Sequence, residues 1–361
     1  MRVVVLGAAS PTGRRVSRDL AEQPEVTRLD LADDDLTAIR SIASQLDSPK
    51  AKVLEMPLAH SDLAGQIGGS DLALGCLDSR SELEVGAARA AIDGRVPYLS
   101  GSPDIDAIEK VLALDGAARS AGTLIVPGLS WTPGVTNLLT RAGSQMVDGP
   151  LSVRIAWTVS PVGRDAEAAL VTACRAFSAS AAVFDRGTWS RELPGGGEEE
   201  VFFPDPVGWR EVSRVAGAEV LTLPIWLQGL ERAVVKGGVG KEAFDRILRW
   251  LARKESVSRD LLRTLARFLT RTPRLGMGIW SAARVDVYGT RHGAPAGLAF
   301  GILDQISNLA AAPLVSGALL MARGGIAGSG VLPPEAVIDP RGFFALLAER
   351  GLRVARLERG R

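Results

Sequence analysis

The feature that most constrains the fold is a short apolar run that leads into a turn of small residues near the start of the chain. Residues 3–6 have the composition of a buried strand, and residues 7–13 read Gly-Ala-Ala-Ser-Pro-Thr-Gly before a helical pattern begins. A strand, a glycine turn and a helix in this order are the context that a dinucleotide-binding fingerprint requires. The sequence therefore predicts an α/β sheet whose first turn binds a pyrophosphate.

Each position of this turn has a role in the prediction. Gly7 permits the tight turn, and Gly13 lets the helix pack close to the sheet. The small side chains of Ala9 and Ser10 let backbone N–H groups approach the phosphates, although a third glycine is commoner at position 10. A fold that has lost its ligand is the alternative. The predicted cofactor contacts in the turn are Gly7, Ala9, Ser10, Pro11, Thr12 and Gly13.

Five further apolar runs follow, and helical patterns separate them. The runs cover residues 26–31, 51–56, 71–77, 96–99 and 123–126. The helical segments cover residues 13–21, 36–46, 83–93 and 105–121. Strands that alternate with helices predict a Rossmann-type, doubly wound parallel sheet in an α/β protein.

The pattern changes after Pro127, because Tyr98 is the sole aromatic residue of the first 130. Thr132 and Pro133 have the composition of a helix start, with Thr132 as N-cap. Longer runs at residues 151–159, 200–203, 219–224, 233–236 and 284–288 predict the strands of a mixed sheet. Helices are expected at residues 242–252, 258–270 and 301–321. We therefore expect a dinucleotide-binding domain over residues 1–128 and an α+β substrate or dimerisation domain over residues 129–300.

Charge and composition exclude several classes of partner. The chain has 42 basic and 41 acidic residues, so its net charge of +1 disfavours binding to nucleic acid or to an anionic membrane. Residues 305–322 lack charges but carry several polar side chains, which favours a buried helix over a membrane span.

The cysteine and histidine content argues against a metal site. Cys76, Cys174, His60 and His292 are the only residues of these two types, and they have no metal-ligand spacing. Two distant cysteines without a secretory signal are typical of reduced thiols, so we expect a cytoplasmic protein.

Acidic residues follow the second strand at the place where a dinucleotide presents its adenosine ribose. Asp33, the preferred residue, or Asp34 would accept hydrogen bonds from the ribose hydroxyls, but the same residues could instead cap the next helix. An NADP 2′-phosphate would be repelled by these carboxylates, so we expect NAD to be preferred. Arg14 is the main counterargument, because its side chain could turn toward a 2′-phosphate.

The carboxyl ends of the parallel strands predict where the substrate lies. Leu77, Asp78 and Ser100 are expected around the nicotinamide. The predicted substrate-binding residues follow the sixth strand, and they are Ser130, Trp131, Thr136 and Asn137. Trp131 could equally serve packing at the domain junction. The general acid stays open among Tyr98, Lys236 and His292.

Five stretches of the sequence together resemble the saccharopine dehydrogenase family. They are residues 7–13, residues 90–100 (Ala-Ala-Ile-Asp-Gly-Arg-Val-Pro-Tyr-Leu-Ser), residues 114–122, residues 127–137 (Pro-Gly-Leu-Ser-Trp-Thr-Pro-Gly-Val-Thr-Asn) and residues 330–335. The resemblance implies a Rossmann domain, an inserted α+β domain, and C-terminal elements over residues 301–361 that return to the first domain.

The resemblance also implies NAD(P)-dependent hydride transfer at a C–N bond of a small, amino-acid-like molecule, and analogy suggests a homodimer. A non-enzymatic dinucleotide sensor or partner protein is the rival hypothesis. A short-chain dehydrogenase is disfavoured, because it would need a lysine four residues after Tyr98, where Ser102 stands.

Overall fold

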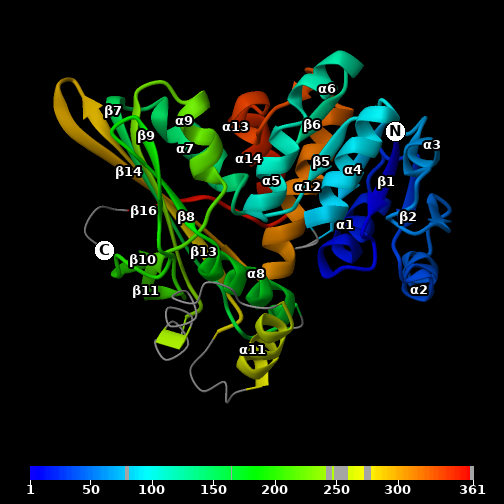
Figure 1. Ribbon diagram of the computed structural model, residues 1–361, viewed down its shortest axis with the longest axis horizontal. Coiled ribbons are helices and arrows are strands. Elements are labelled where there is room, and N and C mark those ends of the chain that lie inside the picture. The colour runs from blue at the N-terminus through cyan, green and yellow to red at the C-terminus, as the bar shows by residue number, and fades with distance from the viewer. Residues whose placement is uncertain (78–80, 164, 241–245, 248–258, 272–277, 358–361) are drawn as a thin grey trace. The chain divides into compact units, whose positions relative to one another are not determined.

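The computed structural model describes residues 1–77, 81–163, 165–240, 246–247, 259–271 and 278–357. The chain divides into two compact units. The first unit is Met1–Ser130 with Ala310–Arg350, and the second unit is Trp131–Leu309 with Gly351–Arg361. Each unit is built around its own sheet (Figure 1).

The first unit contains a seven-stranded parallel sheet in the order β15-β6-β5-β4-β1-β2-β3. Its strands are β1 (Arg2–Leu6), β2 (Arg28–Ala32), β3 (Ala51–Leu54), β4 (Leu72–Gly75), β5 (Tyr98–Ser100), β6 (Leu124–Val126) and β15 (Gly330–Val331). The strand order reverses between β1 and β4, and Val5 of β1 pairs with Leu31 on one side and Leu74 on the other. This reversal is the switch point at which open α/β sheets bind ligands, and the predicted doubly wound sheet is confirmed.

Local signals start several helices of this unit close to where the sequence predicts them, whereas α3 and α13 were not predicted. The helices are α1 (Pro11–Ala21), α2 (Leu36–Leu46), α3 (Leu63–Ile67), α4 (Ser81–Asp93), α5 (Ile105–Leu112), α6 (Asp115–Ala121), α13 (Pro334–Val337) and α14 (Pro340–Glu349). Ser10 caps α1, Asp35 caps α2 and Asp104 caps α5 through their side-chain oxygens. The single helix expected over residues 105–121 is two helices. The break at Leu114 lets the Asp115 carboxylate accept a hydrogen bond from the Val331 N–H of β15 at 2.8 Å.

The second unit contains a nine-stranded mixed sheet. The main path is β10-β11-β12-β7-β13-β14-β16, and the β8–β9 hairpin branches off β12. The strands are β7 (Asp148–Thr158), β8 (Ala181–Asp185), β9 (Thr188–Glu192), β10 (Glu199–Phe203), β11 (Gly208–Arg214), β12 (Leu230–Gly238), β13 (Ser281–Arg291), β14 (Ala294–Asp304) and β16 (Ala355–Leu357). The β12–β7 pair is parallel and the neighbouring pairs are antiparallel. The predicted mixed sheet is therefore confirmed.

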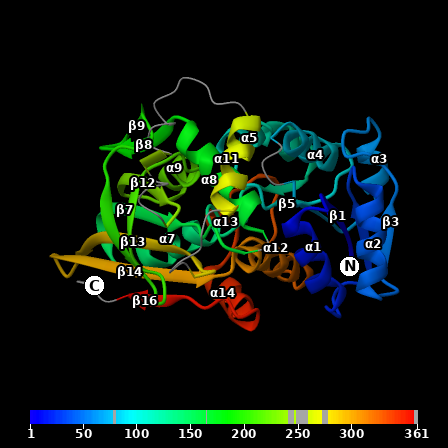
Figure 2. The ribbon, with the colours of Figure 1, turned by 90° about the horizontal axis from the view of Figure 1, so that it is seen from below.

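Helices α7 (Val135–Ser144), α8 (Ala166–Ser178), α9 (Glu219–Trp226) and α11 (Arg259–Arg271) belong to this unit. Helix α7 packs on β13 and β7, α9 packs on β12, and α8 packs against α11 (Figure 2). Alternate residues of β7, such as Val153 and Ile155, are about 1% exposed, and they form the apolar face of the sheet.

One predicted strand of the second unit is wrong, and the start of one predicted helix differs. Residues 219–224 form helix α9 rather than a strand, because a short apolar run fits either period and contacts with α7 select the helix. The first part of the segment 301–321 belongs to strand β14, which pairs with β13 through a tight turn at His292 and Gly293. The apolar helix, α12, covers Ile306–Ala322.

The start of one predicted helix and the placement of the C-terminal residues also differ from the prediction. Helix α7 begins at Val135 after Gly134, whose φ is 114°, so the helix cap lies two residues beyond Thr132. Residues 301–361 do not all return to the first unit, because β16 pairs with β14 of the second sheet. Most of the helix predicted over residues 242–252 lies outside the described part of the chain.

Candidate functional site

The turn between β1 and α1 requires glycine at both of its ends. Gly7 has a φ of 86°, and a Cβ atom at this position would overlap the carbonyl oxygen of Cys76. A Cβ atom on Gly13 would overlap the carbonyl oxygen of Gly7 and lie 2.8 Å from the Cα atom of Ala8. Backbone atoms already occupy the positions that a Cβ atom would take, so this turn, called the cradle below, is close-packed and tolerates no side chain at either glycine.

Two side chains hold this turn from opposite sides. The Ser10 hydroxyl accepts a hydrogen bond from the Gly13 N–H and donates one to the Cys76 carbonyl, each at 2.9 Å. The carboxylate of Asp33 accepts a hydrogen bond from the Ala9 N–H at 3.0 Å. Serine at position 10 therefore joins the turn to the end of β4, which a glycine could not do.

These bonds decide which groups of the turn point outward. The N–H groups of Ala9 and Ser10 bond to Asp33 and to the Gly7 carbonyl, rather than facing a phosphate as the sequence suggests. Pro11 has no N–H group, and the amide of Gly13 is held by Ser10. Of the first-turn amides of α1, this leaves the one on Thr12, beside its half-buried side chain, as the donor for a phosphate.

Arg14 lies directly beside the cradle. Its Nε donates a hydrogen bond to the Ala9 carbonyl at 2.8 Å, and its side chain is exposed. This contact places a guanidinium group next to the turn between β1 and α1. Arg15 of α1 pairs with Asp19 at 2.9 Å. Arg28 pairs with Asp30 at 2.9 Å, and it lies beside Arg2 at the amino end of β2, at the opposite edge of the sheet from the turn.

The acidic residues after β2 have separate structural tasks. Asp33 is 5% exposed, and its second oxygen accepts a hydrogen bond from the Asp35 N–H at 3.2 Å. Asp34 is exposed and accepts a hydrogen bond from the Leu58 N–H at 2.8 Å. Asp35 is the residue that caps α2. The sequence left open whether these aspartates bind ribose or cap a helix, and the structure assigns the cap to Asp35.

The ends of β4 and β5 adjoin the cradle. Leu77 is 1% exposed, and its Cδ2 atom would lie 3.2 Å from a Cβ atom on Gly7. Ser100 is also buried, and its hydroxyl accepts a hydrogen bond from the Ser102 N–H at 3.1 Å. Asp78, the third residue predicted here, lies outside the described residues.

A buried acid that the sequence analysis missed lies at the same edge of the sheet. The Tyr98 hydroxyl donates a hydrogen bond to Oε1 of Glu84 at 2.8 Å, and the two residues are 0% and 1% exposed. Burial raises the pKa of Glu84 above its usual value, and burial together with Glu84 raises the pKa of Tyr98 well above its usual value. A glutamate among alanines in a helix gives no sequence signal of burial, since the same pattern fits an exposed face.

The predicted substrate residues of the second unit bond to a second buried glutamate and its helix. The hydroxyls of Thr132 and Thr136 donate hydrogen bonds to Oε1 of Glu219, at 2.6 Å and 2.9 Å. The Asn137 side chain donates to the Thr222 hydroxyl at 3.2 Å. Burial raises the pKa of Glu219. The polar atoms of Thr136 and Asn137 thus connect the start of α7 to α9. Ser130 and Trp131 are 3% and 7% exposed.

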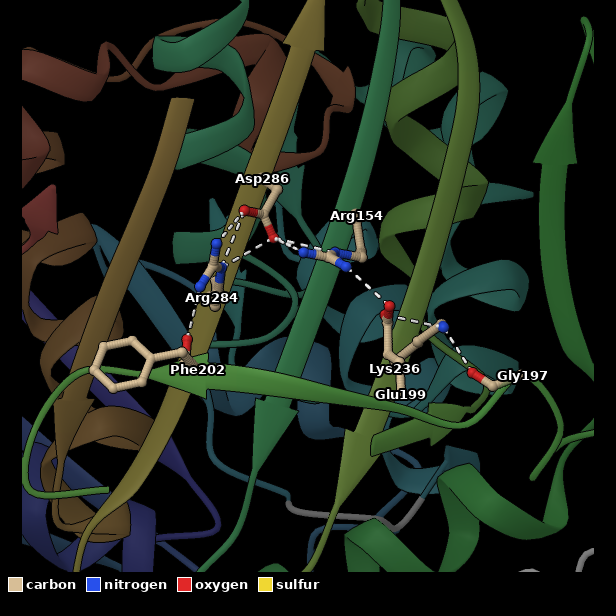
Figure 3. A network of polar contacts seen from close by, with 7 residues as sticks. All are labelled: Arg154, Gly197, Glu199, Phe202, Lys236, Arg284 and Asp286. Carbon is tan, nitrogen blue, oxygen red and sulfur yellow. Dashed lines mark hydrogen bonds and ion pairs between the residues drawn. The ribbon is translucent and has the colours of Figure 1, made fainter. Parts of the chain in front are cut away.

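The remaining candidates for a general acid have different surroundings. His292 is exposed at the β13–β14 turn, with a φ of 52°. Lys236 donates a hydrogen bond to the Gly197 carbonyl at 2.6 Å and pairs with Glu199 at 2.9 Å. Lys236 therefore belongs to a network of charges on the second sheet (Figure 3).

Asp286 is the centre of this network. The guanidinium groups of Arg154 and Arg284 bond to its carboxylate at 2.9 Å and 2.8 Å, and Arg154 also bonds to Glu199 at 2.9 Å (Figure 3). Arg284 donates a further hydrogen bond to the Phe202 carbonyl at 2.9 Å. The network joins β7, β13, β10 and β12, so it ties the β10–β11 hairpin to the centre of the sheet.

Two classes of site are not found in the part of the chain that the structure describes. Its His, Cys, Asp and Glu residues form no cluster of three that could hold a metal ion. None of its helices is long and apolar enough to cross a membrane.

No known protein-family profile matches the sequence. Solved structures do resemble the chain. Apo saccharopine dehydrogenase (L-Glu forming) from Saccharomyces cerevisiae matches with a TM-score of 0.71 and 13% identity, over 99% of this chain and 100% of that chain. DAP dehydrogenase of C. glutamicum matches with a TM-score of 0.49 and 14% identity, over 95% of each chain. The amine dehydrogenase of Mycobacterium smegmatis has a TM-score of 0.49 and 11% identity, over 93% of this chain and 96% of that chain.

The inference about the fold rests on the yeast enzyme, because its similarity extends through both units of the chain. The architecture that the sequence motifs imply, a Rossmann-type parallel sheet with an inserted mixed-sheet unit, is confirmed at the level of fold. At 13% identity the similarity concerns the fold rather than the substrate. The chain therefore has the fold of saccharopine dehydrogenase.

Proposed function

We propose that the chain is an NAD(P)-dependent oxidoreductase, similar to saccharopine dehydrogenase, that transfers a hydride at a C–N bond of an amino-acid-like molecule. The cradle of Gly7 and Gly13 at the switch point of a doubly wound sheet is the observation that carries the proposal. The similarity of fold to a saccharopine dehydrogenase supports the reaction class.

The residues of the cradle fit a pyrophosphate. Both glycines allow the close backbone packing of the tight turn, Thr12 offers an N–H and a hydroxyl, and Arg14 adds a positive charge. A bound nicotinamide dinucleotide would supply the site that gives or accepts the hydride. The chain's own residues would bind the phosphates here and present the ends of β4 and β5 to the nicotinamide half.

Cofactor binding can be tested with a pair of glycine variants. Gly13→Ala adds a Cβ atom that would overlap the Gly7 carbonyl, whereas Gly86 of α4 has no atom within 4 Å of its Cβ position. We expect Gly13→Ala to weaken NADH binding by more than about tenfold and Gly86→Ala to leave it unchanged, as measured by calorimetric titration. If both variants bind NADH as the wild type does, the cofactor does not use this turn.

We propose NAD rather than NADP as the preferred cofactor. The carboxylates of Asp33 and Asp34 follow β2, where the 2′-phosphate of NADP would carry close to two negative charges. The contact of Arg14 with Ala9 supports the opposite preference. Titration of NADH and NADPH decides between them. Tighter NADPH binding that Arg14→Ala weakens would transfer recognition to the arginine.

Hydride transfer can be tested by the absorbance of the reduced nicotinamide. Mixtures of amino acids with NAD or NADP, and mixtures of keto acids and amines with the reduced cofactors, cover both directions. We expect turnover with one mixture. Tight cofactor binding without turnover in any mixture would instead favour the second candidate, a dinucleotide sensor or partner protein.

We also propose that the chain acts in the cytoplasm as a homodimer, on a small molecule and without nucleic acid or membrane. The near-zero net charge supports the absence of a polyanionic partner, and the dimer follows by analogy. Light scattering after size-exclusion chromatography tests the dimer, and a monomer at micromolar concentration would contradict it.

A further inference from the structure

The end of β4 has an unusual steric relationship with its neighbour β5. A Cβ atom on Gly75, the last residue of β4, would overlap the hydroxyl oxygen of Tyr98. Tyr98 is the first residue of β5 and is fully buried. Its side chain therefore leans along the sheet and lies over the Gly75 backbone, which only a glycine permits.

The hydroxyl of Tyr98 is also tied to the helix that follows β4. It donates its hydrogen bond to Glu84 in the first turn of α4. The second oxygen of Glu84, Oε2, is buried and has no hydrogen-bond partner in the described chain. Both Tyr98 and Ser100 of β5 hydrogen-bond to this acid, and the Tyr98–Glu84 bond spans the connection from β4 to α4.

Hydrogen bonds at the ends of β4 and β5 link this pair to the turn between β1 and α1. The Gly101 N–H after β5 bonds to the Gly75 carbonyl at 2.9 Å. The carbonyl of Cys76, the residue after Gly75, accepts a hydrogen bond from the Ser10 hydroxyl at 2.9 Å. The Leu129 N–H bonds to the Ser100 carbonyl at 2.6 Å. A shift of Tyr98 would thus displace the ends of β4 and β5 together, beside the turn.

In a doubly wound sheet these two strand ends adjoin the nicotinamide half of a dinucleotide, whereas β1 and β2 adjoin the adenosine half. We propose that Tyr98 and Glu84 are positioning residues that hold the ends of β4 and β5 for the nicotinamide half of the cofactor. This inference rests on the proposed function. Tyr98 does not act as the general acid, because its hydroxyl is buried and its proton is held toward Glu84.

The test compares two ligands that share the adenosine half. NADH contains the nicotinamide and ADP-ribose lacks it, and both are titrated calorimetrically into the full chain. We expect Tyr98→Phe to weaken NADH binding roughly three- to tenfold, the usual consequence of one lost buried hydrogen bond, and to change ADP-ribose binding by less than about twofold. A purely structural role would instead lower the affinity for both ligands or for neither.

Two substitutions of Glu84 complete the test. Glu84→Gln keeps an acceptor oxygen for Tyr98 and should bind both ligands as the wild type does, whereas Glu84→Ala should reproduce the selective loss of NADH affinity. Three results would each overturn the inference. They are the same loss of NADH affinity in Glu84→Gln and Glu84→Ala, unchanged NADH binding in Tyr98→Phe, and equal losses of affinity for the two ligands. If Tyr98→Phe does not fold, the Glu84 pair decides. A wild-type chain that binds neither ligand would refute the proposed function itself.

Discussion

The two units bury acidic side chains in different ways. Glu84 of the first unit lies in a sheet–helix interface and has a tyrosine hydroxyl as its hydrogen-bond donor. Asp286 of the second unit is equally buried, but two guanidinium groups bond to its carboxylate. Burial raises the pKa of Glu84, and the hydroxyl groups that bond to it only partly oppose this. The two arginines instead supply positive charge that offsets the cost of burying the Asp286 carboxylate.

The largest expected effect is on the charge network. Asp286→Ala would leave Arg154 and Arg284, whose side chains are 27% and 9% exposed, without their shared carboxylate. A buried pair broken on one side costs about 3–5 kcal/mol, so the free energy of unfolding in urea should fall by about that amount. Asp286→Asn keeps the shape of the side chain without its charge, and its free energy of unfolding should be lowered by nearly the same amount. A loss below about 1 kcal/mol in both variants would mean that solvent already compensates these arginines.

An intermediate effect is expected from pH and the two buried glutamates. Burial raises the pKa of Glu84 and of Glu219 above the usual 4.5, although hydroxyl groups of Tyr98, Thr132 and Thr136 partly oppose this. The folded state therefore binds these protons more tightly than the unfolded state. The resulting stabilisation is complete below the unfolded pKa and is lost as the pH rises through the folded pKa.

Glutamine variants isolate this contribution. Glu84→Gln and Glu219→Gln have no proton to lose, so their free energy of unfolding should rise relative to the wild type as the pH increases above the usual pKa of 4.5 toward the raised pKa of the folded state. Each tenfold change in the dissociation constant of the acid is worth about 1.4 kcal/mol. Urea unfolding across this range measures the difference. A constant difference between variant and wild type would show that the acid keeps its ordinary pKa.

The smallest expected effect is at the surface of the first unit. Arg40 and Glu55 form an ion pair at 2.7 Å, but their side chains are 60% and 57% exposed. Water and salt screen such a pair, so Arg40→Ala should change the free energy of unfolding by less than about 0.5 kcal/mol. This variant is the matched control for the Asp286 variants. An effect as large as theirs would show that burial does not explain the difference.

The sequence determined strands β1 to β6 of the first sheet because their signals are local, whereas β15 was not predicted as a strand. Parallel strands that are buried on both faces read as continuous apolar runs, and helix caps such as Ser10 and Asp35 lie next to the helices that they start. Gly7 and Gly13 also predict the cradle from local sequence, because the tight turn lies within seven residues. These features need no knowledge of distant parts of the chain.

The cradle's internal bonds were less accessible to sequence reasoning. Asp33 stands at the expected place after β2, but its hydrogen bond to Ala9 joins residues that are 24 positions apart. The link between Ser10 and Cys76 joins residues 66 positions apart. No pattern of neighbouring residues reports such partners, because they depend on the order of strands in the folded sheet.

Only the tertiary structure decided helix α9 of the second unit and the partners of the buried acids. The eight residues of α9 fit a strand as well as a helix, and the hydrogen bonds of Glu219 and Thr222 to α7 accompany the helix. Glu84 looks like an exposed helix residue until Tyr98 is brought against it from β5. The secondary structure of a short apolar run and the burial of a lone glutamate depend on the surface that covers them, and residues far away in the chain form that surface.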